Sequence, residues 1–317
     1  MKAVKVFEAG GPEVLKITEV PIPKVKPGWS LVKIKGFGIN HSEIFTRDGL
    51  SPSVKFPRIL GIECVGIIEE STSDKFSKGE KIISIMGEMG RAFDGSYAEY
   101  VLLPNEQIYP VKTELSWEDL AAIPETYYTA FESLKALQVK DDDTILVRSG
   151  ASGVGVAFLR LIKAKNKSQR VVASVRSLSK RDKLIELGYD DVVEDKDSVL
   201  QTTEIFDKSL ELVGPTTLKD TFEHIKNGIV CDTGLLGGKW DLEGFEPVGD
   251  IPNGSYLTAI HSGDVDYNRI LEMIDYIEDN SVEVKPAKIY SLDEIADAHR
   301  YLESSNGFGK VIVMNKN

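Results

Sequence analysis

The residues with the clearest chemical potential form a glycine-rich turn near the middle of the chain. The segment from Ile145 to Ala157 has the pattern of a buried strand, a turn and the start of a helix. It supplies Gly150-x-Ser152-x-x-Gly155, in which Ser152 stands at the middle glycine of the G-x-G-x-x-G pattern. Backbone N–H groups at such a turn, and at the helix N-terminus after it, bind the pyrophosphate of a dinucleotide. The pattern therefore favours a dinucleotide site over a purely structural tight turn.

The same turn partly matches the G-x-S-x-G nucleophile elbow of hydrolases. Here Gly150-Ala-Ser152-Gly-Val154 has valine where the second glycine of the elbow belongs. The chain has four histidines that leave a catalytic base open, but no spacing singles one of them out. A hydrolase is the less favoured interpretation.

The strand after this helix indicates which dinucleotide is preferred. In NAD-binding folds, an Asp or Glu about 20 residues past the turn binds the ribose 2′-hydroxyl. Here the strand Val171–Val175 runs into Arg176-Ser177 and then into Lys180-Arg181. Cations in place of a carboxylate suit a 2′-phosphate and predict NADPH, although a solvated basic helix start would have the same residues.

Length and composition limit what this chain can be. Its 317 residues, 42% of them hydrophobic and 28% charged, predict two ordinary globular domains. The formal charge of -12 disfavours nucleic acid and anionic membranes as partners. We expect no signal peptide at Met1 and no membrane-spanning helix. With only Cys64 and Cys231 as cysteines, the sequence predicts a reducing, cytoplasmic location.

The elements that must position the turn change character along the chain. Up to residue 124 the chain shows short strands punctuated by Gly and Pro, which predicts a mostly β domain. Over residues 125–265, helices alternate with buried strands, which predicts an α/β domain with a doubly wound parallel sheet. We expect the tail, residues 266–317, to return to the first domain.

Several ordered segments resemble the medium-chain dehydrogenase/reductase family, and specifically its zinc-less quinone oxidoreductase (zeta-crystallin-like) branch. These segments are residues 38–43, 56–66, 94–100, 121–130, 149–155, 296–302 and 309–313. The resemblance implies a GroES-like catalytic domain made by residues 1–124 and 266–317. It also implies a Rossmann domain over 125–265, a cleft that holds the nicotinamide, and homodimers joined through the sheet edges of the Rossmann domains.

Metal ligands are not expected. Where zinc-bearing members of the family have Cys, His and a third ligand, this chain has Asn40, Ile62 and the pair Tyr127-Tyr128. An amide and an alkyl side chain cannot replace a thiolate and an imidazole around zinc. Glu63, which follows the second position, is then expected to be a buried or loop-pairing carboxylate.

The resemblance also implies roles for individual residues. It places Asn40 and Thr129 near the nicotinamide and the substrate, as the catalytic positions. The predicted cofactor-binding residues are Gly150, Ser152, Gly153, Val154 and Gly155 at the turn, Arg176 and Lys180 at the 2′-phosphate, and Gly234 and Leu236 along the nicotinamide. Two residues depart from the branch: Phe45 stands where many members have Tyr, and Asp195 stands where a Tyr often stacks over the adenosine phosphate.

The expected reaction is metal-free hydride transfer from NADPH to a quinone, with the Asn40 amide stabilising the charge that grows on oxygen. Reduction of an activated alkene, in an enone, enal or enoyl thioester, needs the same geometry and stays open. An NADPH-binding sensor is the alternative from another class. Neither Tyr127, Tyr128 nor His41 is marked out as proton donor. Arg47 is expected to brace its domain, and Cys64 to be buried.

Overall fold

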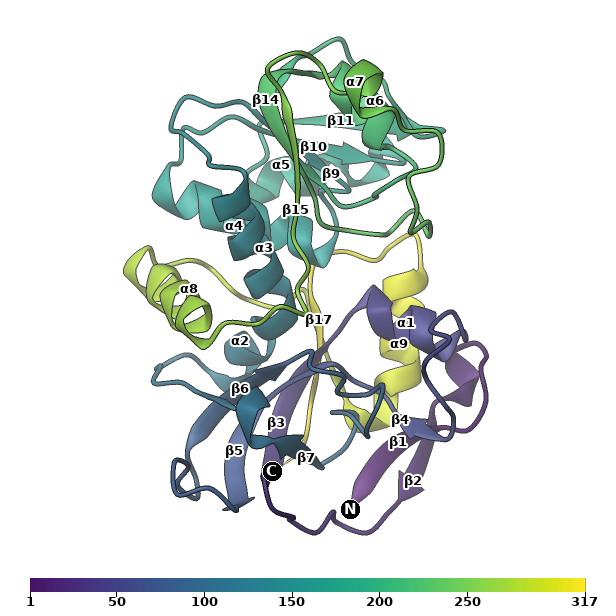
Figure 1. The fold of residues 1–317 in the computed structure, drawn as a ribbon, viewed down its shortest axis with the longest axis vertical. Helices are drawn as coiled ribbons and strands as arrows, with labels where there is room; N and C mark the ends of the chain where they lie inside the picture. The colour runs from purple at the N-terminus through teal and green to yellow at the C-terminus, as the bar shows by residue number, and fades with distance from the viewer. Residues whose placement is uncertain (317) are drawn as a thin grey trace. The chain divides into compact units, whose positions relative to one another are not determined.

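The computed structural model describes residues 1–316 and divides the chain into two units (Figure 1). Unit 1 comprises Met1–Thr126, Ser262–Asp275 and the chain from Val284 onward, and unit 2 comprises Tyr127–His261 and Tyr276–Glu283. The prediction assigned all of 266–317 to the first domain. The structure divides this tail, because the Tyr276 hydroxyl donates a hydrogen bond to the Leu161 carbonyl at 3.0 Å and its ring packs edge-on against Phe131.

Unit 1 is built on two sheets. A small sheet has the strand order β2-β1-β4, and a larger one has the order β16-β17-β3-β5-β6-β8, with β7 also paired to β3. The strands are β1 (Lys2–Val6), β2 (Lys16–Glu19), β3 (Trp29–Ile39), β4 (Arg58–Ile59), β5 (Glu63–Ser71), β6 (Lys81–Ile85), β7 (Tyr100–Pro104), β8 (Tyr109–Pro110), β16 (Lys288–Ser291) and β17 (Val311–Met314). The helices are α1 (His41–Arg47), α2 (Trp117–Ala121) and α9 (Ile295–Glu303), and α8 (Tyr267–Asp279) belongs partly to each unit.

The register of three neighbouring strands sets up one end of the larger sheet. Strand β17 runs antiparallel to β3 with Val311 opposite Ile39, so Lys310 comes beside Asn40. Strand β5 begins at Glu63 and is also antiparallel to β3. Asn40, Glu63 and Lys310, which are far apart in the sequence, therefore meet at the same end of this sheet.

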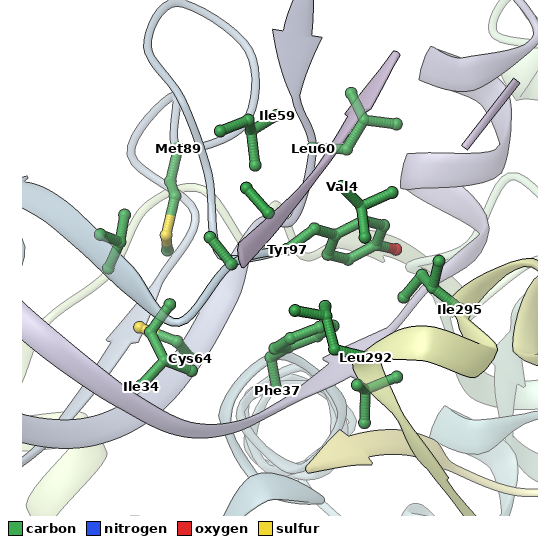
Figure 2. Close-up of a cluster of buried hydrophobic side chains, with 14 of the residues drawn as sticks. Val4, Ile34, Phe37, Ile59, Leu60, Cys64, Met89, Tyr97, Leu292 and Ile295 are labelled. Atoms are coloured by element: carbon green, nitrogen blue, oxygen red, sulfur yellow. The ribbon is translucent and has the colours of Figure 1, made fainter. Parts of the chain in front are cut away.

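A continuous apolar core fixes these strands in unit 1 (Figure 2). The side chains of Val4, Ile34, Phe37 and Tyr97 are almost wholly buried in it, together with Leu292 and Ile295 from the C-terminal part of the chain. Removing such side chains from water is the main stabilising contribution to the fold. The core thus holds the two ends of the chain in one unit.

Unit 2 contains a seven-stranded sheet with the order β12-β11-β10-β9-β13-β14-β15, parallel except for the β11–β12 pair. Its strands are β9 (Ile145–Arg148), β10 (Val171–Val175), β11 (Asp191–Lys196), β12 (Val199–Leu200), β13 (Phe206–Glu211), β14 (Ile225–Asp232) and β15 (Tyr256–Ala259). Its helices are α3 (Pro124–Ala136), α4 (Gly153–Lys165), α5 (Arg181–Leu187), α6 (Leu218–Glu223) and α7 (Pro247–Asp250). The predicted α/β class, with a doubly wound parallel sheet and a mostly β unit, is confirmed.

The order of the strands reverses direction at β9, since β10 lies on one side of it and β13 on the other. Right-handed crossovers then put α4 and α6 on opposite faces of the sheet, as Figure 1 shows. In open parallel sheets the crevice at such a reversal, at the carboxyl ends of the strands, is where ligands bind. No helix within residues 1–316 is long and apolar enough to cross a membrane.

Candidate active site

The predicted dinucleotide turn leaves β9 and enters α4 in the geometry that the motif requires. Ser149 adopts φ 66°, and the Gly150 amide donates to the Ser174 carbonyl at 3.1 Å, which ties the turn to β10. The Ser152 hydroxyl caps α4 by accepting from the Gly155 amide at 3.2 Å, and it donates to the Ser149 carbonyl at 2.7 Å. Both bonds occupy Ser152 as a helix cap, which leaves the nucleophile interpretation without support.

Close packing of the turn depends on Gly155. A Cβ at this position would lie 2.9 Å from the Cα and the carbonyl oxygen of Gly150, which are backbone atoms that cannot move aside. The amides of Gly153 and Val154 belong to the first turn of α4, where N–H groups have no partner within the helix. These N–H groups fit an anionic pyrophosphate, which the helix dipole also favours.

A tyrosine that the sequence analysis did not single out holds this turn. The Tyr189 hydroxyl lies 2.9 Å from the Gly155 carbonyl oxygen and 3.2 Å from that of Gly150, and it donates to this pair. The side chain is 2% exposed, and burial raises the pKa of the phenol well above its usual range. The only sequence signal was its place after Gly188, which ends α5.

Beneath the turn lies a buried arginine. Arg148, the last residue of β9, is fully buried and donates to Asp195 at 2.6 Å and to Asp220 at 2.7 Å. It also donates to the Thr221 hydroxyl at 3.0 Å, which in turn donates to Glu211. Asp195, one of the two departures from the branch, is therefore the ion-pair partner of Arg148.

The end of β10 carries the predicted 2′-phosphate residues. Arg176 is exposed and makes no hydrogen bond or ion pair within the described chain, while Lys180 is half-buried. Burial lowers the pKa of Lys180, and so do the neighbouring charges of Arg176 and Lys183. Arg181, by contrast, is bound to Asp191 at 2.8 Å. The structure therefore brings Arg176 and Lys180 close enough for their positive charges to interact.

The two predicted nicotinamide-lining residues follow β14. The Gly234 amide donates to the Glu211 carbonyl at 3.1 Å, and the Leu236 amide donates to the Leu212 carbonyl at 3.2 Å. This segment thus runs along the chain that leaves β13, at the carboxyl edge of the sheet. Thr129 belongs to unit 2 as well: it lies in α3, is 6% exposed, and its carbonyl accepts from the Ser133 hydroxyl at 2.7 Å.

Asn40 is the centre of an ionic cluster in unit 1. Its side-chain amide donates to Glu63 at 2.8 Å, and its side-chain oxygen accepts from the Lys310 ammonium at 2.7 Å. The same ammonium donates to Glu63 at 2.6 Å, and the other Glu63 oxygen accepts from the Glu125 amide at 2.8 Å. A cation on one side and an anion on the other fix which way the amide faces. One N–H of the Asn40 amide remains for another acceptor.

Two further residues make this cluster possible. A Cβ at Gly38 would overlap the Lys310 ammonium and the Glu63 carboxylate, so only glycine leaves room for the ion pair. Glu43 forms a capping box with Asn40 at the start of α1, and its buried carboxyl also accepts from the Ile62 amide. Burial, and after it the charge of Glu63, raises the pKa of Glu43 to about 8. The N-x-x-E spacing of the capping box was visible in the sequence.

Two family models match this chain. Residues 26–113 match the alcohol dehydrogenase GroES-like domain, and residues 187–313 match the zinc-binding dehydrogenase family. Together they span parts of both units. The chain belongs to the medium-chain dehydrogenase/reductase family. The expected GroES-like and Rossmann-like domains are thereby confirmed.

Individual relatives point to oxidoreductases of this family. Quinone oxidoreductase from Homo sapiens is 32% identical over 169 residues, which are 52% of this chain and 50% of the relative, so the match spans about half the length of that protein. The 2-methylene-furan-3-one reductase of Solanum lycopersicum is 25% identical over 99% of this chain and 79% of its own. Both of these relatives are oxidoreductases.

Solved structures share the whole fold. The quinone oxidoreductase from Coxiella burnetii has a TM-score of 0.83 at 22% identity and covers 100% of this chain and 99% of its own. The yhdH oxidoreductase from Salmonella enterica, solved in complex with NADP, has a TM-score of 0.87 at 18% identity and full coverage of both chains. At these identities the likeness establishes the fold alone.

The family's metal positions hold other chemistry here. Asn40 is bonded to Glu63 and Lys310, Ile62 is a buried alkyl side chain, and the Tyr127 hydroxyl donates to the Glu283 carbonyl at 3.1 Å. Within residues 1–316, no group of three or more His, Cys, Asp or Glu side chains is placed to hold a metal ion. Although the second family model is named for zinc, this donor set does not fit that ion.

The structure also decides three minor interpretations. Arg47 is 1% exposed and bonds to Asp48 and Glu303, so its predicted bracing role is confirmed. Cys64 is fully buried, as predicted, and burial raises the pKa of its thiol. The Tyr127 hydroxyl is bonded to a backbone carbonyl, which favours packing over proton donation.

Proposed function

We propose that this protein is an NADPH-dependent oxidoreductase that transfers hydride to a quinone without a metal ion. The observation that carries the cofactor choice is the end of β10, where Arg176, beside Lys180, has no carboxylate partner within residues 1–316. A carboxylate there would bind the 2′-hydroxyl of NADH and repel the 2′-phosphate of NADPH. The turn at Gly150–Gly155 offers the pyrophosphate its backbone N–H groups.

When bound, the cofactor supplies the hydride and the two electrons of the reduction. The protein's part is to position the acceptor and stabilise charge. Negative charge grows on the acceptor oxygen as hydride arrives, and the remaining N–H of the Asn40 amide is a fixed donor for it. Because Lys310 and Glu63 hold the amide, it needs no reorientation during the reaction. Solvent provides the proton, and Thr129 stays a predicted catalytic position.

Similarity to named relatives supports the acceptor class. Quinone oxidoreductases match at 32% identity and favour a quinone. The relative that covers almost the whole chain is a reductase of 2-methylene-furan-3-one, which supports reduction of an activated alkene as the second candidate. A regulatory NADPH sensor without turnover is the remaining alternative, and Phe45 in place of a tyrosine is its sequence basis.

Cofactor oxidation at 340 nm tests this proposal. We expect purified protein to oxidise NADPH faster than NADH with a quinone, an enone or an enoyl thioester, and a chelator to leave the rate unchanged. Arg176→Ala should raise the Kd for NADPH about tenfold to hundredfold and leave that for NADH unchanged, since a hydrogen-bonded phosphate contact contributes about 1.5–3 kcal/mol. The matched control is Arg181→Ala, which removes a neighbouring cation bound to Asp191. Tight NADPH binding without turnover would favour the sensor.

Assembly and location are part of the proposal. We propose a homodimer, and the edge strand β15 supports it, because among the described strands it pairs only with β14 and it carries Tyr256 at 66% exposure. Light scattering after size exclusion will measure the mass. The excess of acidic side chains supports the absence of nucleic-acid or membrane partners. Two buried free cysteines are consistent with the cytoplasm.

A further inference from the structure

Two arginines in the described chain have no carboxylate partner. Every other arginine, from Arg47 to Arg300, has a carboxylate oxygen at 2.6–3.9 Å. The exceptions within residues 1–316 are Arg176, at the proposed 2′-phosphate site, and Arg91. In a protein with 50 acidic residues, an arginine that is half-buried and unpaired is unusual and calls for an anion from outside the chain.

Arg91 sits in the loop after β6, and this loop is firmly held. The Met86 amide donates to the Ile62 carbonyl at 2.6 Å, and the Arg91 amide donates to the Glu88 carbonyl at 3.0 Å. Met89 is fully buried and points into the core cluster shown in Figure 2. The backbone that carries the Arg91 side chain is therefore held by these hydrogen bonds and by the buried Met89.

The guanidinium contacts the first turn of the helix that Asn40 caps. One Arg91 Nη atom donates to the Ser42 hydroxyl at 2.6 Å. Ser42 is the second residue of α1, and Asn40 caps the same end of this helix. Arg91, Ser42 and Asn40 all belong to unit 1, so their proximity does not depend on the placement of unit 2.

The described residues around Arg91 do not neutralise the charge of its guanidinium. Its Nε is buried and has no hydrogen-bond partner in the described chain, and Ser42 is a neutral acceptor. The nearby Asp94 is engaged elsewhere: it accepts from Arg58 at 3.1 Å and from the Ile59 amide at 3.1 Å. A buried donor without an acceptor is costly, and a planar anion that accepts two guanidinium N–H bonds removes this cost.

We propose that Arg91 is the specificity residue of the acceptor site and binds an anionic oxygen group carried by the acceptor. This inference rests on the second candidate of the proposed function, reduction of an activated alkene, in which the acceptor is bound where Asn40 can meet its reacting oxygen. The group is a carboxylate on a small enone or a phosphate on the carrier of an enoyl thioester. In either reaction, the acceptor gains hydride at its β-carbon and a solvent proton at its α-carbon, and NADPH becomes NADP⁺.

Two pairs of acceptors separate these sources. The carboxylate pair is (E)-4-oxopent-2-enoate and its methyl ester, which share the enone and differ in charge, in one methyl group and in electron withdrawal at the alkene, so the change in their ratio on Arg91→Met isolates the charge. The phosphate pair is crotonoyl-coenzyme A and crotonoyl-N-acetylcysteamine, which share the thioester. We expect wild type to prefer the charged member of one pair by about tenfold to hundredfold in kcat/KM, as a charged hydrogen-bonded contact implies. The pair that shows the preference identifies the anion that Arg91 binds as a carboxylate or a phosphate.

The variant Arg91→Met should abolish that preference through a higher KM for the charged acceptor, with the uncharged acceptor unaffected. Arg91→Lys should restore part of it, because an ammonium keeps the charge but not the bidentate geometry. Arg58→Met is the matched control, since it removes a neighbouring arginine that already has a carboxylate partner. The Kd for NADPH should be the same in all variants.

Binding of an unreactive analogue keeps the test independent of turnover. Calorimetry with 4-oxopentanoate, its methyl ester and desulfo-coenzyme A, added to the NADP⁺-loaded protein, should show the same loss on Arg91→Met for the anion that matches. If no acceptor is turned over but this charge-dependent binding persists, the proposed reaction fails and the role of Arg91 stands. Equal affinities and equal kcat/KM within both pairs in wild type, or an Arg91→Met effect that is the same for charged and uncharged members, would overturn it.

Discussion

The turn around Gly155 in unit 2 and the cluster around Asn40 in unit 1 position chemistry by different physical means. The turn presents backbone N–H groups, and what keeps its shape is the lack of a side chain at Gly155 and the Tyr189 hydroxyl. The cluster presents one side-chain amide, held between the charges of Lys310 and Glu63. Steric fit determines the shape of the turn, whereas buried electrostatic interactions determine the orientation of Asn40 in the cluster. Substitutions that alter charge should therefore act strongly on the cluster and weakly on the turn.

Lys310→Met should have the largest effect. It leaves the buried Glu63 without its cation, and breaking a buried pair in this way lowers the free energy of unfolding by about 3–5 kcal/mol. Urea unfolding can be followed through Trp29 and Trp117 of unit 1 after Trp240, the tryptophan of unit 2, is changed to Phe. The variant should also lower kcat at saturating NADPH, because Asn40 loses the donor to its side-chain oxygen.

The control for this prediction is Lys2→Met. Lys2 also pairs with a carboxylate, Asp293 at 2.8 Å, but both side chains are exposed, and such pairs contribute about 0–1 kcal/mol. Adding Glu63→Gln to Lys310→Met should recover stability by removing the stranded charge. Equal losses for Lys2→Met and Lys310→Met would show that burial of the cluster does not matter.

The pH dependence of unit 1 should come next in size. The folded pKa of Glu43 is about 8 and lies above its ordinary value of 4.5, so the folded state holds an extra proton between these values. This contribution to stability is complete below pH 4.5 and is lost as the pH rises towards 8, with a slope of about 1.4 kcal/mol per pH unit. Wild type should therefore lose about 3 kcal/mol more than Glu43→Gln between pH 5.5 and 7.5. The prediction would be wrong if the urea midpoints of wild type and Glu43→Gln changed by the same amount between pH 5.5 and 7.5.

Gly155→Ala tests the turn. The new Cβ meets the backbone of Gly150 at 2.9 Å, and overpacking of this kind costs about 1–3 kcal/mol. We expect the Kd for NADPH, measured by quenching of protein fluorescence, to rise about tenfold or more. Lys165→Ala, on the exposed last turn of the same helix, should leave it unchanged. Because the effect of Gly155→Ala on the Kd is steric, it should be the same at pH 5.5 and 7.5, whereas the effect of Glu43→Gln on stability should depend on pH.

The two regions also differ in what the sequence revealed. The turn is contiguous in the chain, so the strand, the glycines and the capping Ser152 predicted its structure directly. The cluster joins residues 40, 63 and 310, and only the register of β17, β3 and β5 brings them together. Asn40 and Glu63 were singled out by resemblance, but nothing local in the sequence marks Lys310 as their partner.

The same distinction applies to Asp195. The resemblance places this carboxylate near the cofactor's phosphate. A strand pattern, however, does not show which cation neutralises a charged side chain. The structure pairs it with Arg148, two strands away in the sheet. Domain class and the order of the elements follow from hydrophobic periodicity, whereas buried ion pairs are set by tertiary packing.

Tyr189→Phe should have the smallest effect and sharpens the comparison most. It keeps the ring, and so the packing against the turn, but removes the hydroxyl that donates to the Gly150 and Gly155 carbonyls. One lost hydrogen bond contributes about 0.5–1.5 kcal/mol, so we expect the Kd for NADPH to rise only a few-fold. Tyr276→Phe is the control, because it removes a similar bond to the Leu161 carbonyl in the same unit. A loss as large as that of Gly155→Ala would mean that the turn, too, is held by polar contacts and not by steric fit.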